Sequence, residues 1–224
     1  PAFAEKLLEG LEEIDWPVST KEIQKNWIGK STGVEVDFDI VGGGKFSIFT
    51  TCIETIYGIT FMVLATDGEN VKSLMDRVEN KEEVQAYIDE TLKKNDMDRT
   101  ELNKTKSGCP LKGLYAINPV NGKEVPLFIG DFVLASYGTG AVMAVPSHDQ
   151  RDFEYAIAHN IDMIQVIEGR DVSECAFEKQ DYLGKGCKLI NSEEFTGLTV
   201  EEAKEAITVK LENKGVARRK VNYH

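Results

Sequence analysis

The hydrophobic pattern of this chain changes its period several times, which limits the folds that it can adopt. Apolar residues first recur at helical spacing, which predicts one helix over residues 3–14 and a second that ends at residues 27–29. From residue 33 the period becomes two, as is typical of a half-buried strand. The chain then alternates between short strands and helical segments. The predicted strands cover residues 34–40, 46–51, 59–65, 114–120, 125–129, 132–137, 141–145 and 163–167.

Helical patterns interrupt this series of strands. Residues 69–104 carry two apolar stripes in a strongly charged surround, and residues 200–211 predict a closing helix. Another helix is expected after Pro146, where Ser147 and Gln150 have the spacing of a capping box. Asn121-Gly122 between two strand patterns indicates a hairpin. We therefore predict a mixed β/α fold, a β-barrel core with peripheral helices, instead of an alternating βαβ sheet.

The charge balance restricts the classes of partner. The 224 residues include 26 Lys and Arg against 38 Asp and Glu, a formal net charge of −12. Such a chain is poorly suited to grip a long phosphate backbone, although a pocket for the end of a nucleic acid is compatible with it. The longest apolar run, residues 59–65, falls far short of the roughly 20 residues of a membrane helix. Because charges interrupt the first residues, we expect no targeting segment. We also expect no membrane contact, a cytoplasmic location and a monomer.

Metal-site and nucleotide-binding motifs are weak in this sequence. The four cysteines, at positions 52, 109, 175 and 187, show no Cys-x-x-Cys pairing, and the chain has only three histidines, so we expect no zinc site. The segment from Gly29 to Gly33 matches a nucleophile elbow and the end of a phosphate loop. An elbow would have to follow a strand, whereas this segment precedes one, and a phosphate loop would need glycine where Gln24 stands. We interpret the segment as a turn.

Two clusters of polar residues are candidates for a site. Thr50, Thr51 and Thr55 surround a strand end, where hydroxyls can bind a polar substrate or orient water, although threonine is also simply a good strand residue. Asp149 and Asp152 share one face at a helix start and could hold an ammonium group. The alternative is that these acids only complement the helix dipole.

Further candidates lie beside the second cluster. Arg151 is within reach of a neighbouring carboxylate or phosphate, and His148 is a candidate base, although a lone histidine is more often a structural residue. Gly138-Thr139-Gly140 either lets the backbone approach a ligand or only turns the chain.

The order of these motifs along the chain resembles one family. Asn26 to Gly33, Thr50-Thr51 with Thr55 and Gly58, and Tyr137 to Asp152 occur in the order found in the editing domain (connective peptide 1) of bacterial-type leucyl-tRNA synthetases. The resemblance covers essentially all of the chain. Isoleucyl and valyl enzymes share the threonine-rich segment and a Gly-Thr-Gly motif, whereas the run from Met143 to Asp152 is typical of the leucyl enzymes.

The resemblance implies a domain organisation. Residues 1–26 would come from the parent catalytic domain, residues 27–214 would form the editing domain, and residues 215–224 would return to the catalytic domain. The family's editing domains are β-barrels with peripheral helices. The His-Ile-Gly-His and Lys-Met-Ser-Lys-Ser signatures are missing from the chain, so ATP and Mg would act only in the parent catalytic domain and no cofactor is expected for editing.

The function implied is post-transfer editing. The domain would hydrolyse the ester of isoleucyl, norvalyl or methionyl groups on the 3′ terminal adenosine of tRNA(Leu), and its partners would be this tRNA and the parent synthetase domains. A second site of this kind is needed because a hydrophobic pocket separates side chains that differ by one methylene by only about 1–3 kcal/mol. The ester is activated, so oriented water and electrostatic stabilisation suffice without a nucleophilic side chain.

The resemblance also implies roles for individual residues. Asp152 would anchor the substrate α-ammonium, Thr55 would exclude the leucyl side chain, and Thr50 and Thr51 would contact the ester and hold water. Asp149 would support this catalytic group. The substrate-binding residues would be Thr55, Tyr137 beside the terminal adenosine, Met143 in the side-chain pocket, Arg151 and His148.

Some positions depart from the family's pattern. Cys52, Ile53 and Glu54 stand where the family usually has Arg-Pro-Asp, which removes a partner for Asp149. Ser147 replaces a small Gly or Ala, a change that the predicted capping box explains. Other readings are a binding module for the aminoacylated tRNA end that does not hydrolyse it, a structural insert, and an editing domain of the valyl or isoleucyl type.

Overall fold

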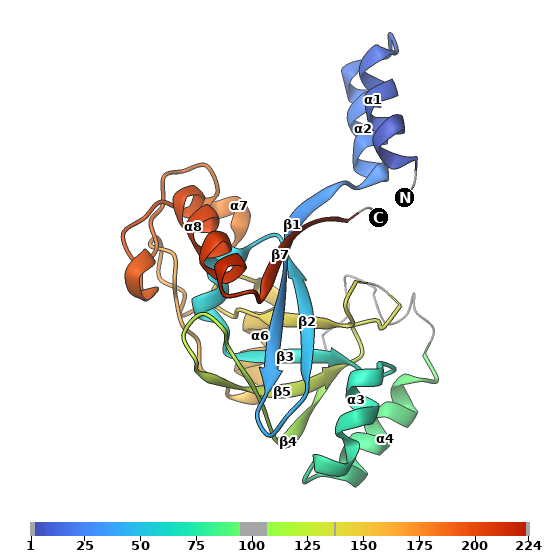
Figure 1. Ribbon diagram of the computed structural model, residues 1–224, viewed down its shortest axis with the longest axis vertical. Helices are drawn as coiled ribbons and strands as arrows, with labels where there is room; N and C mark the ends of the chain where they lie inside the picture. The colour runs from blue at the N-terminus through green and yellow to red at the C-terminus, as the bar shows by residue number, and fades with distance from the viewer. Residues whose placement is uncertain (1–2, 95–106, 137, 223–224) are drawn as a thin grey trace.

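A seven-stranded sheet forms the centre of the computed structural model, which describes residues 3–94, 107–136 and 138–222 (Figure 1). The strand order is β2-β1-β4-β5-β3-β6, and β7 pairs with β1 beside this path. All pairs are antiparallel except β3 with β5. The strands are β1 (Ser31–Ile40), β2 (Lys45–Thr50), β3 (Phe61–Ala65), β4 (Gly108–Ile117), β5 (Glu124–Gly130), β6 (Ala141–Ala144) and β7 (Ala217–Asn222).

The predicted mixture of strands and peripheral helices is confirmed, and the barrel is open. The end strands β2 and β6 approach each other, but no hydrogen-bonded ladder joins them in the described part of the chain. The cavity described below lies along this unpaired edge. Closure would have required backbone pairing where side chains of β2 and β6 instead face a hollow space.

Helices surround the sheet on several sides. They are α1 (Ala4–Glu13), α2 (Val18–Ile28), α3 (Glu69–Leu74), α4 (Lys81–Thr91), α6 (Gln150–His159), α7 (Lys179–Tyr182) and α8 (Val200–Asn213). Short 3₁₀ turns are η1 (Ile53–Gly58), η2 (Met75–Arg77) and η3 (Glu193–Phe195). None of the helices in the described ranges is long and apolar enough to cross a membrane.

The first two helices form a hairpin that stands away from the sheet (Figure 1). Leu11 is a buried apolar residue of this hairpin, and ion pairs of Lys25 with Glu12 at 2.6 Å and of Lys30 with Glu5 at 2.7 Å tie its parts together. Gly29 ends α2 in the left-handed conformation at φ 59°, which glycine adopts without strain. The predicted turn is confirmed at Gly29, but Gly33 lies within β1.

Two apolar clusters form the core. The larger one includes β1 and β2 residues such as Phe38 and Ile48, together with one face of α8. The smaller one packs the rings of Phe61, Phe128 and Tyr155 between β3, β5 and α6. Each fully buried large aliphatic or aromatic side chain contributes about 1.5–3 kcal/mol, so these clusters dominate the stability of the fold.

The last strand was not indicated by the sequence pattern. β7 pairs along β1 from Ser31 opposite Asn222 to Val36 opposite Ala217. Its basic residues meet acids on β1: Arg218 Nε donates to Glu35 Oε1 at 2.8 Å, and Lys220 also binds Glu35. These ion pairs explain how Glu35 is buried in a strand, and they make residues 217–222 part of the sheet.

Two predicted strands are absent from the described residues. Residues 131–136 form a turn, and the Val133 side chain packs from this turn into the smaller cluster. The apolar pattern of this segment therefore reflects burial in a turn and not pairing in the sheet. In residues 163–167 only Ile167 forms a bridge, with Leu189, because the backbone N–H groups of Val166 and Ile167 bind His148 instead. The predicted hairpin at Gly122 is confirmed between β4 and β5, and residues 95–104 of the predicted helical excursion lie outside the described ranges.

Candidate functional site

A cavity of about 380 Å³ opens at the edge between β2 and β6. Two segments that are far apart in the sequence form its walls: residues 49–55 at the end of β2, and residues 142–152, which run from β6 into the first turn of α6. Tyr182 at the end of α7 completes the lining. The lining residues are Phe49, Thr50, Thr51, Cys52, Thr55, Val142, Met143, Val145, His148, Asp149, Arg151, Asp152 and Tyr182.

The first wall is the threonine loop, which we define as residues 50–55. Thr50 Oγ1 accepts a hydrogen bond from the backbone nitrogen of Cys52 at 3.0 Å. Thr55 Oγ1 donates to the Cys52 carbonyl at 2.9 Å and is 2% exposed. These local bonds fix both side chains, as hydroxyl groups commonly do in turns. Thr50 therefore retains a proton to donate, whereas Thr55 retains acceptor capacity and stands as a fixed wall.

Two lysines hold Thr51 from outside the loop. Lys179 Nζ on α7 donates to Thr51 Oγ1 at 3.3 Å, and Lys204 Nζ on α8 donates to the Thr51 carbonyl at 2.6 Å. With one lone pair engaged by an ammonium group, the Thr51 hydroxyl can direct its proton toward a substrate oxygen or a water. The loop thus presents two hydroxyl donors at the cavity.

The second wall is the N-terminus of α6. Asp149 is its cap, and Asp149 Oδ1 accepts from the backbone nitrogens of Arg151 and Asp152, both at 3.0 Å. The predicted capping box with Ser147 is therefore wrong. The helix begins at Gln150, and the buried Ser147 hydroxyl has no hydrogen-bond partner among the described residues. The carboxylate of aspartate two residues further along satisfies the exposed N–H groups of the first turn instead.

Asp152 lies deeper in the cavity than Asp149. Its side chain is nearly buried, at 7% exposed, and its Oδ2 accepts from the backbone nitrogen of Val145 at 3.0 Å. This bond fixes the position of the carboxylate in the cavity lining. A buried carboxylate of this kind attracts an ammonium ion strongly, because little water competes for either charge.

His148 is buried beside the cavity and joins three backbone groups. Nδ1 is 2.8 Å from the Phe177 carbonyl, and Nε2 accepts from the backbone nitrogens of Val166 and Ile167 at 3.0 and 3.2 Å. Both nitrogens are engaged, so Nδ1 carries the proton and the ring is neutral. Burial lowers the pKa of His148 from 6.5 to about 4. In this structure both ring nitrogens bind backbone groups while the ring lines the cavity, and the predicted role of His148 in substrate binding stays a prediction.

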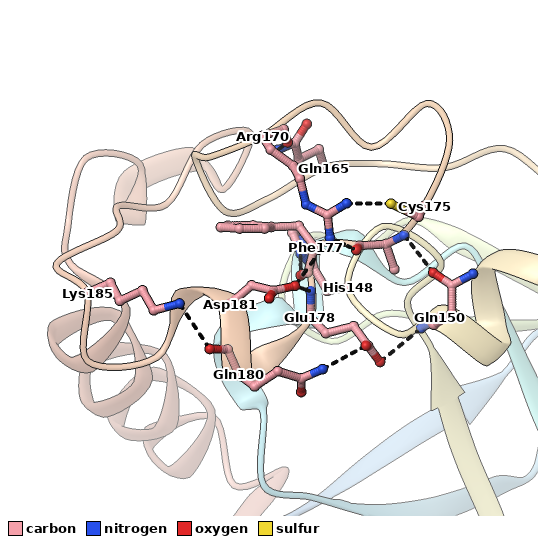
Figure 2. A network of polar contacts seen from close by, with 11 residues as sticks. His148, Gln150, Gln165, Arg170, Cys175, Phe177, Glu178, Gln180, Asp181 and Lys185 are labelled. Carbon is pink, nitrogen blue, oxygen red and sulfur yellow. Dashed lines mark hydrogen bonds and ion pairs between the residues drawn. The ribbon is translucent and has the colours of Figure 1, made fainter. Parts of the chain in front are cut away.

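A segment that we call the strap (residues 170–185) packs against this end of α6 (Figure 2). The Ala176 nitrogen donates to Gln150 Oε1 at 3.0 Å, and the Gln150 nitrogen donates to Glu178 Oε1 at 3.4 Å. Arg170 binds the Ala176 carbonyl and Asp181, and so joins the start of the strap to its middle and to α7. The strap therefore fixes α7 relative to the helix end that carries the two aspartates.

The remaining residues indicated by the sequence are placed as follows. Met143 is half-buried on β6 opposite Met62 and lines the cavity. Arg151 is exposed, and its Nη2 is 3.8 Å from Asp149 Oδ2, so Asp149 has a cationic partner in this structure. Tyr137 lies outside the described residues. Eight of the nine predicted site residues thus surround one cavity, while their roles stay predictions.

The structure adds residues that the sequence pattern did not indicate. Tyr182 is 1% exposed and its hydroxyl donates to Glu54 Oε1 at 3.2 Å. Glu54 is fully buried, its Oε2 has no hydrogen-bond partner among the described residues, and burial raises the pKa of its carboxyl above 4.5. Tyr182 lies in a loop-rich stretch without periodicity, so no signal in the sequence could have located it. Glu54 was noticed only as a departure from the family's pattern.

A second, more apolar cavity of about 510 Å³ adjoins the first. Phe49 and Val142 line both cavities, which places them in the partition between the two. Its other lining residues are Ser31, Phe132, Val133, Leu134, Gly138, Thr139, Ala141 and Asn222. The pair of cavities offers one polar compartment with two carboxylates and one apolar compartment with aromatic rings.

The chemistry available in the polar compartment is limited and specific. It holds a buried carboxylate, two hydroxyl donors and a neutral histidine that is fully hydrogen-bonded. The part of the chain that the structure describes has no group of His, Cys, Asp and Glu side chains that could bind a metal ion. Such a site can bind an ammonium group next to a polarised carbonyl and orient a water. Within the described ranges, no hydrogen bond joins the Thr50 or Thr51 hydroxyl to a histidine or carboxylate that could act as its base.

Comparisons with known proteins agree with this geometry. Residues 25–212 match the family model described as leucyl-tRNA synthetase, editing domain. A leucine–tRNA ligase of Alkaliphilus oremlandii is 43% identical over 221 residues, and one of Clostridium botulinum is 46% identical over 222 residues. In both cases the match covers 99% of this chain, whereas it covers 27% and 26% of the relatives.

A solved structure shows the same fold. The ternary complex of Agrobacterium radiobacter K84 agnB2 LeuRS with tRNA and LeuAMS aligns with a TM-score of 0.73 at 28% identity, over 99% of this chain and 24% of that chain. The chain thus spans about a quarter of the length of the relatives that it matches. From the family model and the relatives together, the chain belongs to the leucyl-tRNA synthetase editing-domain family.

Proposed function

We propose that the polar cavity hydrolyses the ester bond of tRNA(Leu) that carries a wrong amino acid. The observation that carries this proposal is the position of Asp152 and the threonine loop around one cavity. Isoleucyl, norvalyl and methionyl esters are the expected substrates, and the products are the free amino acid and the 3′ hydroxyl of the terminal adenosine. The reaction consumes one water and needs no metal or cofactor.

Each group has a task in this mechanism. Asp152 binds the α-ammonium and so places the ester carbonyl next to the threonine loop. The Thr50 and Thr51 hydroxyls donate to the carbonyl oxygen, where negative charge develops when water attacks, or hold the water itself. Thr55 and Met143 line the space for the amino-acid side chain, and Thr55 excludes the leucyl group. Asp149 and Arg151 fix the helix end that carries Asp152.

The adjoining apolar cavity supports a place for the terminal adenosine. Its aromatic rings, Phe49 and Phe132, suit a base, and its shared wall with the polar cavity suits a ligand with an aminoacyl group at one end and a nucleoside at the other. The net charge of −12 argues that the tRNA body is held elsewhere, in the parent synthetase. ATP and Mg would act in that parent's catalytic domain.

Single-turnover deacylation tests the proposal. The chain in excess at low salt is mixed with isoleucyl-, norvalyl-, methionyl- or leucyl-tRNA(Leu). We expect the first three esters to be cleaved faster than in buffer and the leucyl ester to be spared. Equal decay with and without protein, in the chain and in the full-length parent enzyme, contradicts hydrolysis. Binding of a non-hydrolysable aminoacyl-adenosine without turnover would instead identify a binding module.

A further inference from the structure

The strap contacts both walls of the polar cavity, although it contributes only Tyr182 to the lining in the described structure. On one side it holds the start of α6, through the Phe177 carbonyl at His148 and through Ala176 and Glu178 at Gln150 (Figure 2). Each of these bonds involves a backbone atom. These bonds couple the position of the strap to that of the helix end that carries Asp152.

On its other side the strap holds the threonine loop. Lys179 Nζ donates to Thr51 Oγ1 at 3.3 Å, and the Tyr182 hydroxyl donates to Glu54 Oε1 at 3.2 Å. Both residues belong to the single turn of α7. The capping box of α7, formed by Glu178 and Asp181, makes this turn a rigid unit between the two walls.

The Tyr182–Glu54 hydrogen bond lies in the protein interior, and its loss would destabilise the fold around it. Glu54 is fully buried, and its second carboxyl oxygen has no hydrogen-bond partner among the described residues. Removal of the Tyr182 hydroxyl would leave both carboxyl oxygens without a side-chain donor in the described structure, and an unsatisfied buried polar group is destabilising. Glu54 and Thr55 are neighbours in the threonine loop. If the loop shifts to give Glu54 a new partner, the cavity wall at Thr55 moves with it.

We propose that Tyr182 and Lys179 are positioning residues, which hold the threonine loop at the separation from Asp152 that hydrolysis and rejection of the leucyl group require. This inference rests on the function proposed above. Neither residue needs to touch the reacting atoms. Burial raises the pKa of the Glu54 carboxyl above 4.5, so this group is held in a dry environment where the hydrogen bond from Tyr182 matters to its position.

The test compares variants that have matched controls within the chain. Tyr182→Phe removes a buried hydroxyl, and Tyr87→Phe removes the hydroxyl of a half-buried tyrosine, which bonds to Ser107 and the Asp131 nitrogen away from the cavity. Lys179→Ala removes a strap lysine that reaches the threonine loop, and Lys185→Ala removes one that bonds to Gln180 within the strap. Circular dichroism and the midpoint of thermal unfolding show that each variant is folded.

The readouts are the maximal rate and half-saturating concentration for single-turnover cleavage of isoleucyl-tRNA(Leu), with leucyl-tRNA(Leu) beside it. Small misplacements of reacting groups cost large factors in rate, so we expect Tyr182→Phe and Lys179→Ala to lower the maximal rate about tenfold or more. Half-saturation should change little, and the preference for isoleucyl over leucyl esters should fall. The two controls should match the unmodified chain.

Rescue separates positioning from general stability. Glu54→Gln keeps an acceptor for Tyr182 and should retain most of the rate. Tyr182→Phe combined with Glu54→Met removes both polar partners, which is often nearly neutral, and should recover rate relative to Tyr182→Phe alone. A double variant no faster than the single one would overturn the role of this hydrogen bond.

A second readout does not depend on turnover. Cys52 lies in the threonine loop, with its Sγ 3.7 Å from Thr51 Oγ1, so its alkylation by iodoacetamide reports the position of the loop. Mass spectrometry gives its rate relative to half-buried Cys187. We expect Tyr182→Phe to raise this ratio. If the unmodified chain is inactive, the proposed function is contradicted, but the alkylation ratio still tests the positioning role. If the ratio is unchanged in both Tyr182→Phe and Lys179→Ala, the positioning role is overturned.

Discussion

The Asp152 carboxylate accepts a hydrogen bond from the backbone nitrogen of Val145 at 3.0 Å, which ties the first turn of α6 to the end of β6. One bond thus joins the helix that carries the acids to the strand that carries Met143. The carboxylate sits at the junction of the two elements and is nearly buried there. Its charge and its acceptor oxygen serve two different purposes, which substitution can separate.

Asp152→Asn should abolish most of the ester hydrolysis while the domain remains folded. The amide keeps an oxygen that can accept from Val145, but it loses the negative charge that we propose binds the α-ammonium. We expect the single-turnover rate on isoleucyl-tRNA(Leu) to fall about 100-fold, in line with the loss of a charged hydrogen bond of roughly 2–3 kcal/mol. Asp162→Asn, which neutralises an exposed acid outside the cavity, is the control. An Asp152→Asn variant of full activity would exclude the residue from ammonium binding.

Thr55→Ala should let the cavity accept the leucyl side chain. Thr55 is 2% exposed and fixed by its bond to the Cys52 carbonyl, so removal of its hydroxyl and methyl opens space instead of letting a neighbour fill it. Discrimination by a side-chain-sized space is worth about 1–3 kcal/mol, so leucyl-tRNA(Leu) should be cleaved about 10–200 times faster. Thr60→Ala makes the same change in a different cavity. Continued protection of leucyl-tRNA(Leu) in Thr55→Ala would refute the steric role.

The sequence predicted most of the residues that line the polar cavity, but few of the contacts that hold those residues in place. Thr55 and Asp152 could be predicted because their motifs occur in the order typical of the family. Motif order is visible in the sequence, whereas side-chain packing is not. The cap of α6 was assigned to Ser147 because spacing alone cannot tell which of two neighbouring cap-forming residues has the extended backbone; the structure gives that position to Asp149.

The features that the sequence did not indicate share a physical cause. Strand β7 is strongly basic and has no apolar alternation, and its pairing is set by Glu35 on a strand at the other end of the chain. Tyr182 reaches the cavity through a strap held by backbone bonds to Gln150 and His148, which leave no periodic pattern. Long-range polar contacts of this kind are properties of the folded chain and not of a local window.

His148 should make the stability of the domain depend on pH. Its folded pKa of about 4 lies below its ordinary value of 6.5, so below pH 6.5 the unfolded chain binds a proton that the folded chain refuses. The contribution of His148 to the free energy of unfolding is fully present above pH 6.5. It decreases as the pH falls, and it stops changing below the folded pKa. The span corresponds to about 3 kcal/mol.

Urea unfolding from pH 7 to pH 4 measures this effect. The free energy of unfolding of the unmodified chain should fall by about 3 kcal/mol more than that of His148→Gln, which is less stable at pH 7 but lacks the titrating ring. Parallel curves for the unmodified chain and His148→Gln would show that His148 does not titrate across this range.

Gly33→Ala should damage the site from outside the cavity. A Cβ at this position would lie 2.4 Å from the Thr50 carbonyl oxygen and 2.7 Å from the ring of Phe49, too close for either atom. Gly33 lies inside β1, with β2 on one side and β7 on the other, so the strand cannot simply retreat. The end of β2 must move instead, and the threonine loop begins there.

We expect Gly33→Ala to lower the free energy of unfolding in urea by about 1–3 kcal/mol, as overpacking commonly does, and to slow isoleucyl-tRNA(Leu) cleavage. Gly10→Ala is the matched control, because a Cβ at Gly10 in α1 meets no atom within 4 Å. That substitution should raise helix stability by about 0.5–1 kcal/mol and leave cleavage unchanged. If Gly33→Ala unfolds like the unmodified chain and cleaves at the same rate, the close approach of Phe49 and Thr50 to β1 does not position the threonine loop.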